Sequence, residues 1–403
     1  MSAPRSGLAA SPSRSLPGAR RFRLSRHVRL VAIARNEAEN LPKLAEAVKG
    51  QINSWLIVID SRTDDDTESV ACDVFAGVPG RVVTSALTAE TFRFDAARNE
   101  ALDLAREDGV HLLLLDVDSP IIGELPDDLT APVYWCKTIQ GGSDWTMPFL
   151  IRSDVNASYV FPAHEVLIIH DDYEPVVLDD VYISRTGAGT NPERIAWTIK
   201  VLQEEWEQSK DPRAAFYLGN MFRDKYLHDR NNEDRDTAVN WYIERANAGN
   251  GWEEEAFLSI LRTAELYAFD DPHKGMKCYL EAASRRPQRP EPWFELCRLC
   301  NQHGEHLSAL AFAEKGLGLP QTTDWLMVAR WIASWGLYFE GAVAAWHLGD
   351  KVGAYTAFER CLARDDLTPE YRAAAIANLA QRDAPKPKTR PQNNRSRSKK
   401  PRR

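Results

Sequence analysis

Four short apolar segments recur between residues 29 and 116 of this 403-residue chain, and amphipathic stretches separate them. The segments are RLVAIA, WLIVID, RVVTSA and HLLLLD, at 29–34, 55–60, 81–86 and 111–116. Short continuous apolar strands that alternate with helices are typical of a parallel sheet buried on both faces. We therefore predict an α/β domain with a Rossmann-like, mostly parallel sheet.

Polar residues stand where these segments end. Asp60 is the last residue of the second segment, and Asp116 and Asp118 lie at the end of the fourth. Ligands of open α/β sheets bind outside the carboxyl ends of the strands. Two carboxylates one residue apart favour a hard divalent cation, Mn²⁺ or Mg²⁺, between them. Taken alone, the pair also fits solvated turn aspartates that cap the next segment.

After Asp118 the pattern becomes β-rich and less regular. Strands are predicted at 132–139, 146–154 and 165–171, from their β-branched and aromatic content. Glu165 begins the last of these directly after His164, and His170 stands near its end. The alternative interpretation is that these are ordinary polar residues at strand edges.

Four motifs occur in order along this half: ArgAsnGlu at 35–37, ValIleAsp at 58–60 followed by SerArgThrAsp, PheAspAlaAlaArgAsn at 94–99, and LeuAspValAsp at 115–118. As a set they resemble the nucleotide-sugar half of a family-2 glycosyltransferase with the GT-A fold. The more specific resemblance is to the bacterial branch in which tetratricopeptide repeats follow that domain. The match covers about residues 30 to 200.

The resemblance implies a role for each matching residue on the donor side. Asp60 matches the carboxylate that holds the nucleoside, usually uridine, and Arg62 takes the place of a common glycine. Asp116 and Asp118 match the D-x-D pair that binds the metal on the diphosphate, and Arg98 reaches the same diphosphate. The base pocket and the donor-binding set include Ala34, Asn36 and Glu37.

On the acceptor side the resemblance implies that Glu165 is the catalytic base and that His164 orients substrate or phosphate. A carboxylate is suitable if a partly dry pocket raises its pKa toward neutral. His170 matches a third metal ligand or a diphosphate contact. Asp144 is a weaker alternative base.

The second half changes to helical periodicity from about residue 192. Small residues recur with a second contact residue four positions later, and the first members are separated by 37, 34 and 45 residues. Tetratricopeptide repeats have a period of about 34 and such a small contact residue. We predict four repeats and a closing helix at 369–381, with these contact pairs: Ala238 and Tyr242, Gly275 and Tyr279, Ala309 and Ala313, Ala354 and Phe358.

One further pattern, C-x₂-C-x₂-H-x₂-H, spans Cys297, Cys300, His303 and His306. Cysteine and histidine are zinc ligands, but this spacing is too tight for a zinc finger. We predict instead that the cysteines pack inside a repeat.

Charge and composition bound the rest of the chain. Residues 1–28 carry six arginines and 384–403 carry nine basic residues, and neither segment has an acid. We predict two disordered basic segments flanking a GT-A domain at 29–190 and helical repeats at 191–383. The segments are either solvated or contact nucleic acid, an anionic surface or an acidic partner. Six scattered cysteines and no long apolar run favour the cytoplasm.

The predicted function is that of an inverting, metal-dependent glycosyltransferase. The donor is a nucleotide sugar, first a UDP-sugar, and the repeats select a protein or peptide acceptor. A glycan or lipid acceptor stays open. The rivals are a repeat scaffold with a degenerate nucleotide-binding domain, and a nucleotidyltransferase, which would bring a Gly-rich phosphate loop that is missing at 35–37.

Overall fold

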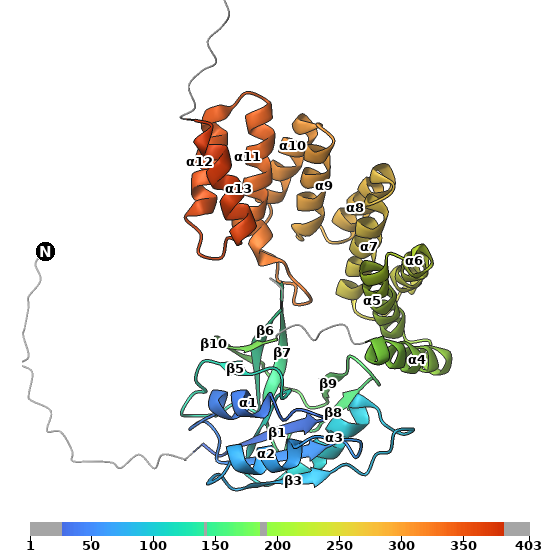
Figure 1. Cartoon of the computed structure of the whole chain (residues 1–403), viewed down its shortest axis with the longest axis vertical. Coiled ribbons are helices and arrows are strands. Elements are labelled where there is room, and N and C mark those ends of the chain that lie inside the picture. The colour runs from blue at the N-terminus through green and yellow to red at the C-terminus, as the bar shows by residue number, and fades with distance from the viewer. Residues whose placement is uncertain (1–25, 141–142, 186–191, 383–403) are drawn as a thin grey trace, which may run out of the picture.

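The computed structural model describes residues 26–140, 143–185 and 192–382. An α/β domain extends from β1 (Val28–Ala34) to β10 (Val176–Ser184). A helical domain follows, from α4 (Pro192–Ser209) to α13 (Pro369–Ala380). Its helices form an arc that rises from one side of the α/β domain and curves over it (Figure 1).

The first four strands form the parallel half of the sheet, as predicted. β1 lies between β2 (Ser54–Ile59) and β4 (His111–Leu114), and β3 (Gly80–Thr84) is at the edge. The connecting helices are α1 (Leu41–Ala47), α2 (Thr67–Val74) and α3 (Phe94–Ala105).

The leucines of β4 are apolar because both faces of this strand are covered. Leu113 packs on the α1 and α2 side, whereas Leu112 and Leu114 pack against α3, and none is more than 8% exposed. Alternate side chains of a strand point to opposite faces, so a central strand needs apolar residues at every position.

The other half of the sheet is mixed, so that four of the seven strand pairings in the described sheet are parallel. β7 (Ser143–Arg152) runs antiparallel to both β4 and β6 (Val133–Gln140). β10 is parallel to β6 and pairs antiparallel with β5 (Ile121–Ile122). Only two residues separate β6 from β7 in the sequence, and a connection that short can join only antiparallel strands.

The predicted strand at 165–171 lies outside this sheet. It is β9 (Val166–Ile169), which pairs with β8 (Ala157–Val160) in a separate hairpin. The hairpin packs on α3 through Tyr159 and Leu167, close to the main sheet.

The helical domain contains four helix pairs within residues 192–382, with α4 before them and α13 after them. The pairs are α5 (Pro212–Asp229) with α6 (Asn232–Asn247), α7 (Glu253–Ala268) with α8 (Pro272–Arg285), α9 (Glu291–Gln302) with α10 (His306–Leu317), and α11 (Leu337–His347) with α12 (Lys351–Leu362). The predicted contact pairs all lie on the second helix of a pair and are buried. At Gly275 an added Cβ would lie 2.8 Å from Ala268 Cα, which explains the small residue.

The cysteine and histidine pattern serves packing, as predicted. Cys297 and Cys300 are buried in α9, the His303 ring donates to the Leu299 carbonyl at 2.9 Å, and His306 stacks on His347 at 4.0 Å. In the described parts of the chain, no three His, Cys, Asp or Glu side chains are gathered to hold a metal ion.

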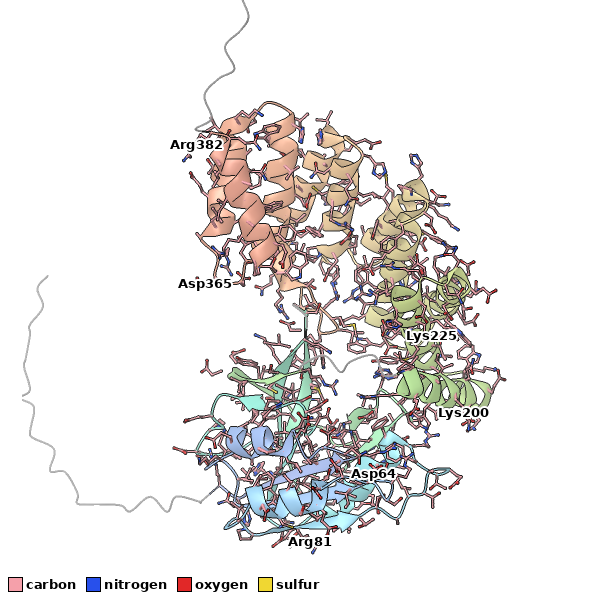
Figure 2. All side chains as sticks on the ribbon, viewed as in Figure 1. Asp64, Arg81, Lys200, Lys225, Asp365 and Arg382 are labelled. Carbon is pink, nitrogen blue, oxygen red and sulfur yellow. The ribbon has the colours of Figure 1, made fainter. Side chains whose placement is uncertain are left out.

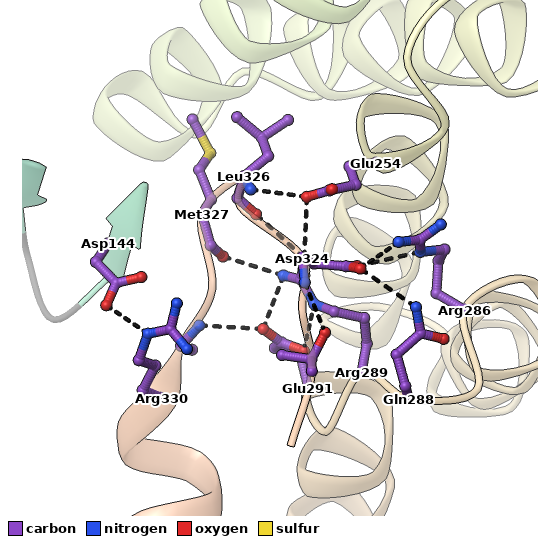
Figure 3. A network of polar contacts seen from close by, with 12 residues as sticks. Asp144, Glu254, Arg286, Gln288, Arg289, Glu291, Asp324, Leu326, Met327 and Arg330 are labelled. Carbon is purple, nitrogen blue, oxygen red and sulfur yellow. Dashed lines mark hydrogen bonds and ion pairs between the residues drawn. The ribbon is translucent and has the colours of Figure 1, made fainter. Parts of the chain in front are cut away.

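The long spacing before the last helix pair corresponds to a connection, residues 318–331, that turns back to the α/β domain. We call it the return loop. Its Val328 forms an antiparallel bridge with Asp144, and Arg330 Nε lies 2.6 Å from Asp144 Oδ2 (Figure 3). Trp325 packs edge-on against Trp135 of β6, with 5.0 Å between ring centroids. Asp144, the alternative base, is therefore engaged in a domain contact.

Arg289 anchors the return loop to the repeats. It is fully buried and donates to Glu291 at 2.8 and 2.9 Å and to the carbonyls of Leu326 and Met327 at 3.1 Å (Figure 3). Glu254 accepts from the backbone N–H groups of Trp325 and Leu326. Side chains of the repeats thus satisfy backbone groups of the loop, which a buried loop requires.

The described residues include only the last part of the predicted N-terminal arm. Residues 26–28, assigned to the disordered arm, belong to the fold, because Arg26 donates to the Leu125 carbonyl at 2.5 Å and Val28 begins β1. The rest of the predicted arm, 1–25, and the tail at 384–403 lie outside the described residues, as do 186–191 between the domains. No described helix is long and apolar enough to span a membrane.

Candidate functional site

Asp60 follows β2 at the carboxyl edge of the sheet and is 7% exposed. Arg62 holds it with its backbone N–H and its Nε, each 2.8 Å from Asp60 Oδ1, and with Nη2 on Oδ2. Burial alone would raise the pKa of Asp60, but these hydrogen bonds and the charge of Arg62 keep it below the ordinary value of 3.8. Arg62, which stands where the resembling family commonly has a glycine, therefore binds both oxygens of Asp60, the carboxylate predicted to hold the nucleoside.

The end of β1 supplies the rest of the predicted base pocket. Asn36 adopts a left-handed backbone conformation, with φ of 55°, and exchanges hydrogen bonds of 2.6 and 3.0 Å with Asp64. Ala34 is buried. Figure 2 shows Asp64 in the α/β domain. The loops after β1 and β2 are thus joined side by side, as the predicted pocket requires.

Glu37 belongs electrostatically to the D-x-D pair. Burial raises its pKa, a hydrogen bond from Asn40 lowers it, and the negative charges of Asp118 and Asp116 raise it further. The net effect is a raised pKa. Glu37 thus lies within electrostatic range of Asp116 and Asp118, although in the described residues the three carboxylates do not form a metal-binding group.

Arg98 joins the donor and acceptor sides of the predicted site. Its Nε lies 2.5 Å from Glu165 Oε1, and its Nη2 binds Asp116 Oδ1. Asp116 Oδ2 accepts from Arg185 Nη2 at 2.5 Å. Burial would raise the pKa of Asp116, but Arg98 and Arg185 hold it well below its ordinary range. Residues 18 and 67 positions away from Arg98 thus meet at one guanidinium.

The fit of a divalent cation rests on Asp116 and Asp118. Asp118 is half-buried and its Oδ1 accepts from Ser119 Oγ at 2.8 Å. His170 does not join them: it follows β9, where its Nε2 lies 2.9 Å from Ser158 Oγ. The prediction of His170 as a third ligand is therefore not met. Mg²⁺ commonly takes one or two carboxylates and completes its shell with phosphate and water. In this structure Arg98 and Arg185 bind the two oxygens of Asp116.

His164 faces the helical domain. Its ring stacks on Tyr217 of α5 with 4.1 Å between centroids and 7° between planes, and its carbonyl accepts from Arg213 at 3.0 Å. Partial enclosure by the protein and the positive charges of Arg213 and Arg185 lower the pKa of His164, although the residue keeps an exposed surface. A neutral ring orients neighbours by hydrogen bonding and stacking.

Sequence reasoning missed the residues that the helical domain and β10 bring to this edge. Arg185 follows β10, a strand with exposed acids that the apolar pattern did not indicate. Arg213 and Tyr217 lie on the first turns of α5. Aromatic contacts of Trp197 with Phe94 and an ion pair of Glu205 with Arg93 fix α4 beside α3. Nothing local in the sequence marks these positions as part of a site.

Comparison with known proteins gives partial likenesses only. No family model and no curated protein matches the chain. Among solved structures, MamA is 12% identical over 47% of this chain and 92% of its own, with a TM-score of 0.33. BtubC from P. vanneervenii is 15% identical over 48% and 83%, at 0.38. A thermophilic TPR protein in Thermus thermophilus is 14% identical over 47% and 92%, at 0.28. Scores this low do not establish a shared activity or partner.

Proposed function

We propose that this chain is an inverting, family-2-like glycosyltransferase of the GT-A fold. It would move a sugar from a nucleotide sugar, with UDP-sugars the first candidates, to a protein or peptide that the repeats select. The observation that carries the proposal is the position of Arg98 between Asp116 and Glu165. The strand order β3-β2-β1-β4, with polar residues at three carboxyl ends, supports it.

The nucleoside would bind between the loops after β1 and β2. The lowered pKa keeps Asp60 ionised, and an ionised carboxylate accepts hydrogen bonds from a base N–H or a ribose hydroxyl. Arg62 must leave Asp60, or share it, when the nucleoside arrives. This exchange is a cost that the donor's other contacts have to offset.

The diphosphate would bind beside Asp116 and Asp118, which would hold the divalent cation. When bound, the cation supplies positive charge to the leaving diphosphate. Arg98 and Arg185 present planar guanidinium groups, whose paired N–H donors suit phosphate oxygens. A phosphate at this edge would compete with the carboxylates for both arginines.

Glu165 would act as the base. The acceptor oxygen attacks the anomeric carbon, the bond from that carbon to the diphosphate breaks, and the nucleoside diphosphate leaves with the electron pair. The acceptor proton passes to a Glu165 oxygen. Because Arg98 binds Glu165 at 2.5 Å, transfer of Arg98 to the diphosphate would release Glu165 as the donor arrives. Donor binding would thus prepare the base.

The test is a screen of UDP-, GDP- and dTDP-sugars against the purified chain, with Mn²⁺ or with chelator. Thermal stabilisation reports binding, and release of nucleoside diphosphate reports turnover. We expect one donor to stabilise the chain with metal, Asp118→Ala to remove that response, and Glu165→Gln to keep binding and lose turnover. Asp103→Ala, an exposed position on α3, is the control and should behave as the wild type. No stabilisation by any donor would overturn the proposal.

A repeat scaffold is the second candidate, and two contacts favour it. Arg62 occupies Asp60, and two arginines occupy both oxygens of Asp116. If these pairs are permanent, the edge of the sheet is a structural ion cluster and the repeats are the functional half. The donor screen separates the two, because a permanent cluster leaves the thermal stability unchanged by any sugar nucleotide.

A further inference from the structure

The segment that leads into Glu165 has an unusual backbone. Phe161 and His164 have φ values of 89° and 56°, in the left-handed region that favours glycine. Histidine adopts this region more often than most residues, whereas Phe161, with its bulky ring, is a genuine outlier there. Such residues persist only where surrounding structure holds them, and they gather at functional sites. The question is what holds residues 161–164 here.

The first turn and a half of α5 contacts both residues. Arg213 Nη2 donates to the His164 carbonyl at 3.0 Å, and its guanidinium carbon lies 5.7 Å from the centroid of the Phe161 ring. Tyr217, four residues later on the same helix face, stacks on the His164 ring. Arg213 and Tyr217 of the helical domain therefore contact the two ends of the segment, Phe161 and His164.

The side chain of Arg213 is itself held by buried charged residues of the helical domain. Its Nη1 binds Glu255 of α7, whose side chain is 2% exposed, and Glu255 also meets the buried Arg245 of α6 at 3.4 Å. Arg245 in turn donates to the backbone carbonyls of Asn250 and Trp252. The direction of Arg213 is thus set by the packed interior of the first two helix pairs.

We infer that Arg213 and Tyr217 are positioning residues that hold residues 161–164 in this conformation and so set Glu165 against Arg98. The first helix pairs are then part of the catalytic unit as well as a surface for the acceptor. The role of Glu165 in this inference rests on the proposed function, whereas the hold on residues 161–164 stands without it. The rival interpretation is that α5 merely attaches one domain to the other.

The experiment measures amide hydrogen exchange of residues 161–170 by mass spectrometry, which needs no substrate. Variants are Arg213→Met, Arg213→Lys, Tyr217→Leu and Tyr217→Phe. We expect Arg213→Met and Tyr217→Leu to raise exchange in this segment about tenfold while β1 to β4 stay protected. The conservative variants should recover most of the protection. Arg330→Met, which breaks the ion pair between the return loop and Asp144, is the control and should leave 161–170 unchanged.

The outcomes are separable from those of the donor screen. If a donor is found, Arg213→Met should lower kcat about tenfold and leave donor Kd nearly unchanged, as expected for a misplaced base. Exchange within twofold of the wild type in Arg213→Met overturns the inference, whatever the screen gives. If that variant does not fold because Glu255 is left unpaired, Arg213→Met with Glu255→Gln replaces it. Raised exchange without any donor response would refute the proposed function alone.

Discussion

Two arginine-centred clusters, one at the candidate site and one at the return loop, differ in what surrounds the guanidinium. Arg289 is fully buried, and two carboxylates and two backbone carbonyls share its donors. The side chain of Arg98 is 14% exposed, and within the described residues its hydrogen bonds go to Asp116 and Glu165 alone. A buried guanidinium whose donors are taken by carboxylates and backbone carbonyls has no donor left for a ligand. A guanidinium that binds only side chains at the edge of the sheet can exchange those partners for a ligand.

The largest expected effect is at the closed cluster. Arg289→Met leaves the buried Glu291 without its main partner and removes the second arginine of Asp324, which Arg286 still binds. Breaking a buried pair costs about 3–5 kcal/mol of unfolding free energy. Urea unfolding followed by circular dichroism measures it. Arg298→Met, at a 40% exposed arginine paired with Glu295, is the control and should cost less than about 1 kcal/mol. A loss as small as the control's would show that the return loop does not depend on Arg289.

Arg98→Met should cost less stability than Arg289→Met, about 1–3 kcal/mol, because water reaches this edge and Arg185 still serves Asp116. It should also abolish thermal stabilisation by the donor. The same unfolding experiment and the donor screen measure the two effects. If Arg98→Met were the more destabilising variant, the distinction between an open and a closed cluster would fail.

Acid should weaken both clusters. Arginine partners lower the pKa of Asp116 and of Asp324 against the effect of burial. Each carboxylate therefore contributes stability above the unfolded value near 3.8, and that stability is lost as pH falls through the lower folded value. Thermal unfolding between pH 5 and 2, compared with Asp116→Asn and Asp324→Asn, tests this. Below pH 3.8 the thermal stability of both variants should depend less steeply on pH than that of the wild type. An unchanged slope would contradict the pairing.

Arg62→Gly should tighten nucleotide binding by up to about tenfold, because Asp60 no longer has to exchange partners. Isothermal titration with UDP and Mn²⁺ measures the change. Arg62→Met is the matched control: it keeps a side chain over Phe92 and removes the ion pair. Equal gains in both variants would assign the cost to the ion pair, and weaker binding in both would mean that Arg62 contacts the donor.

The smallest effect concerns the contact between the return loop and β7. A double-mutant cycle with Asp144→Asn and Arg330→Gln should give a coupling of about 0.5–1 kcal/mol in unfolding free energy, because Arg330 is 38% exposed and solvent screens the pair. Urea unfolding of the four proteins measures it. A coupling near zero would leave the Val328 bridge and Trp325 as the effective contacts there.

The sequence by itself determined the elements whose signals are local. Continuous apolar runs specify buried strands, which is why β1 to β4 lie where the pattern predicts them. The small residue and the contact residue four positions later specify helix faces that touch, so the four contact pairs are buried as expected. The cysteine pattern was interpretable for the same reason, because its two cysteines lie on one buried face of a helix.

Only the tertiary structure decided which polar groups meet. Arg98 meets Glu165 from 67 positions away, Arg330 meets Asp144 from 186, and Arg213 reaches His164 from another domain. The strand before Arg185 carries too little local apolar pattern to be recognised from the sequence. The ion pair of Arg62 with Asp60 likewise leaves no signal in the sequence. Burial leaves a periodic trace along the sequence, whereas the pairing of distant charges depends on how packed elements are placed in space.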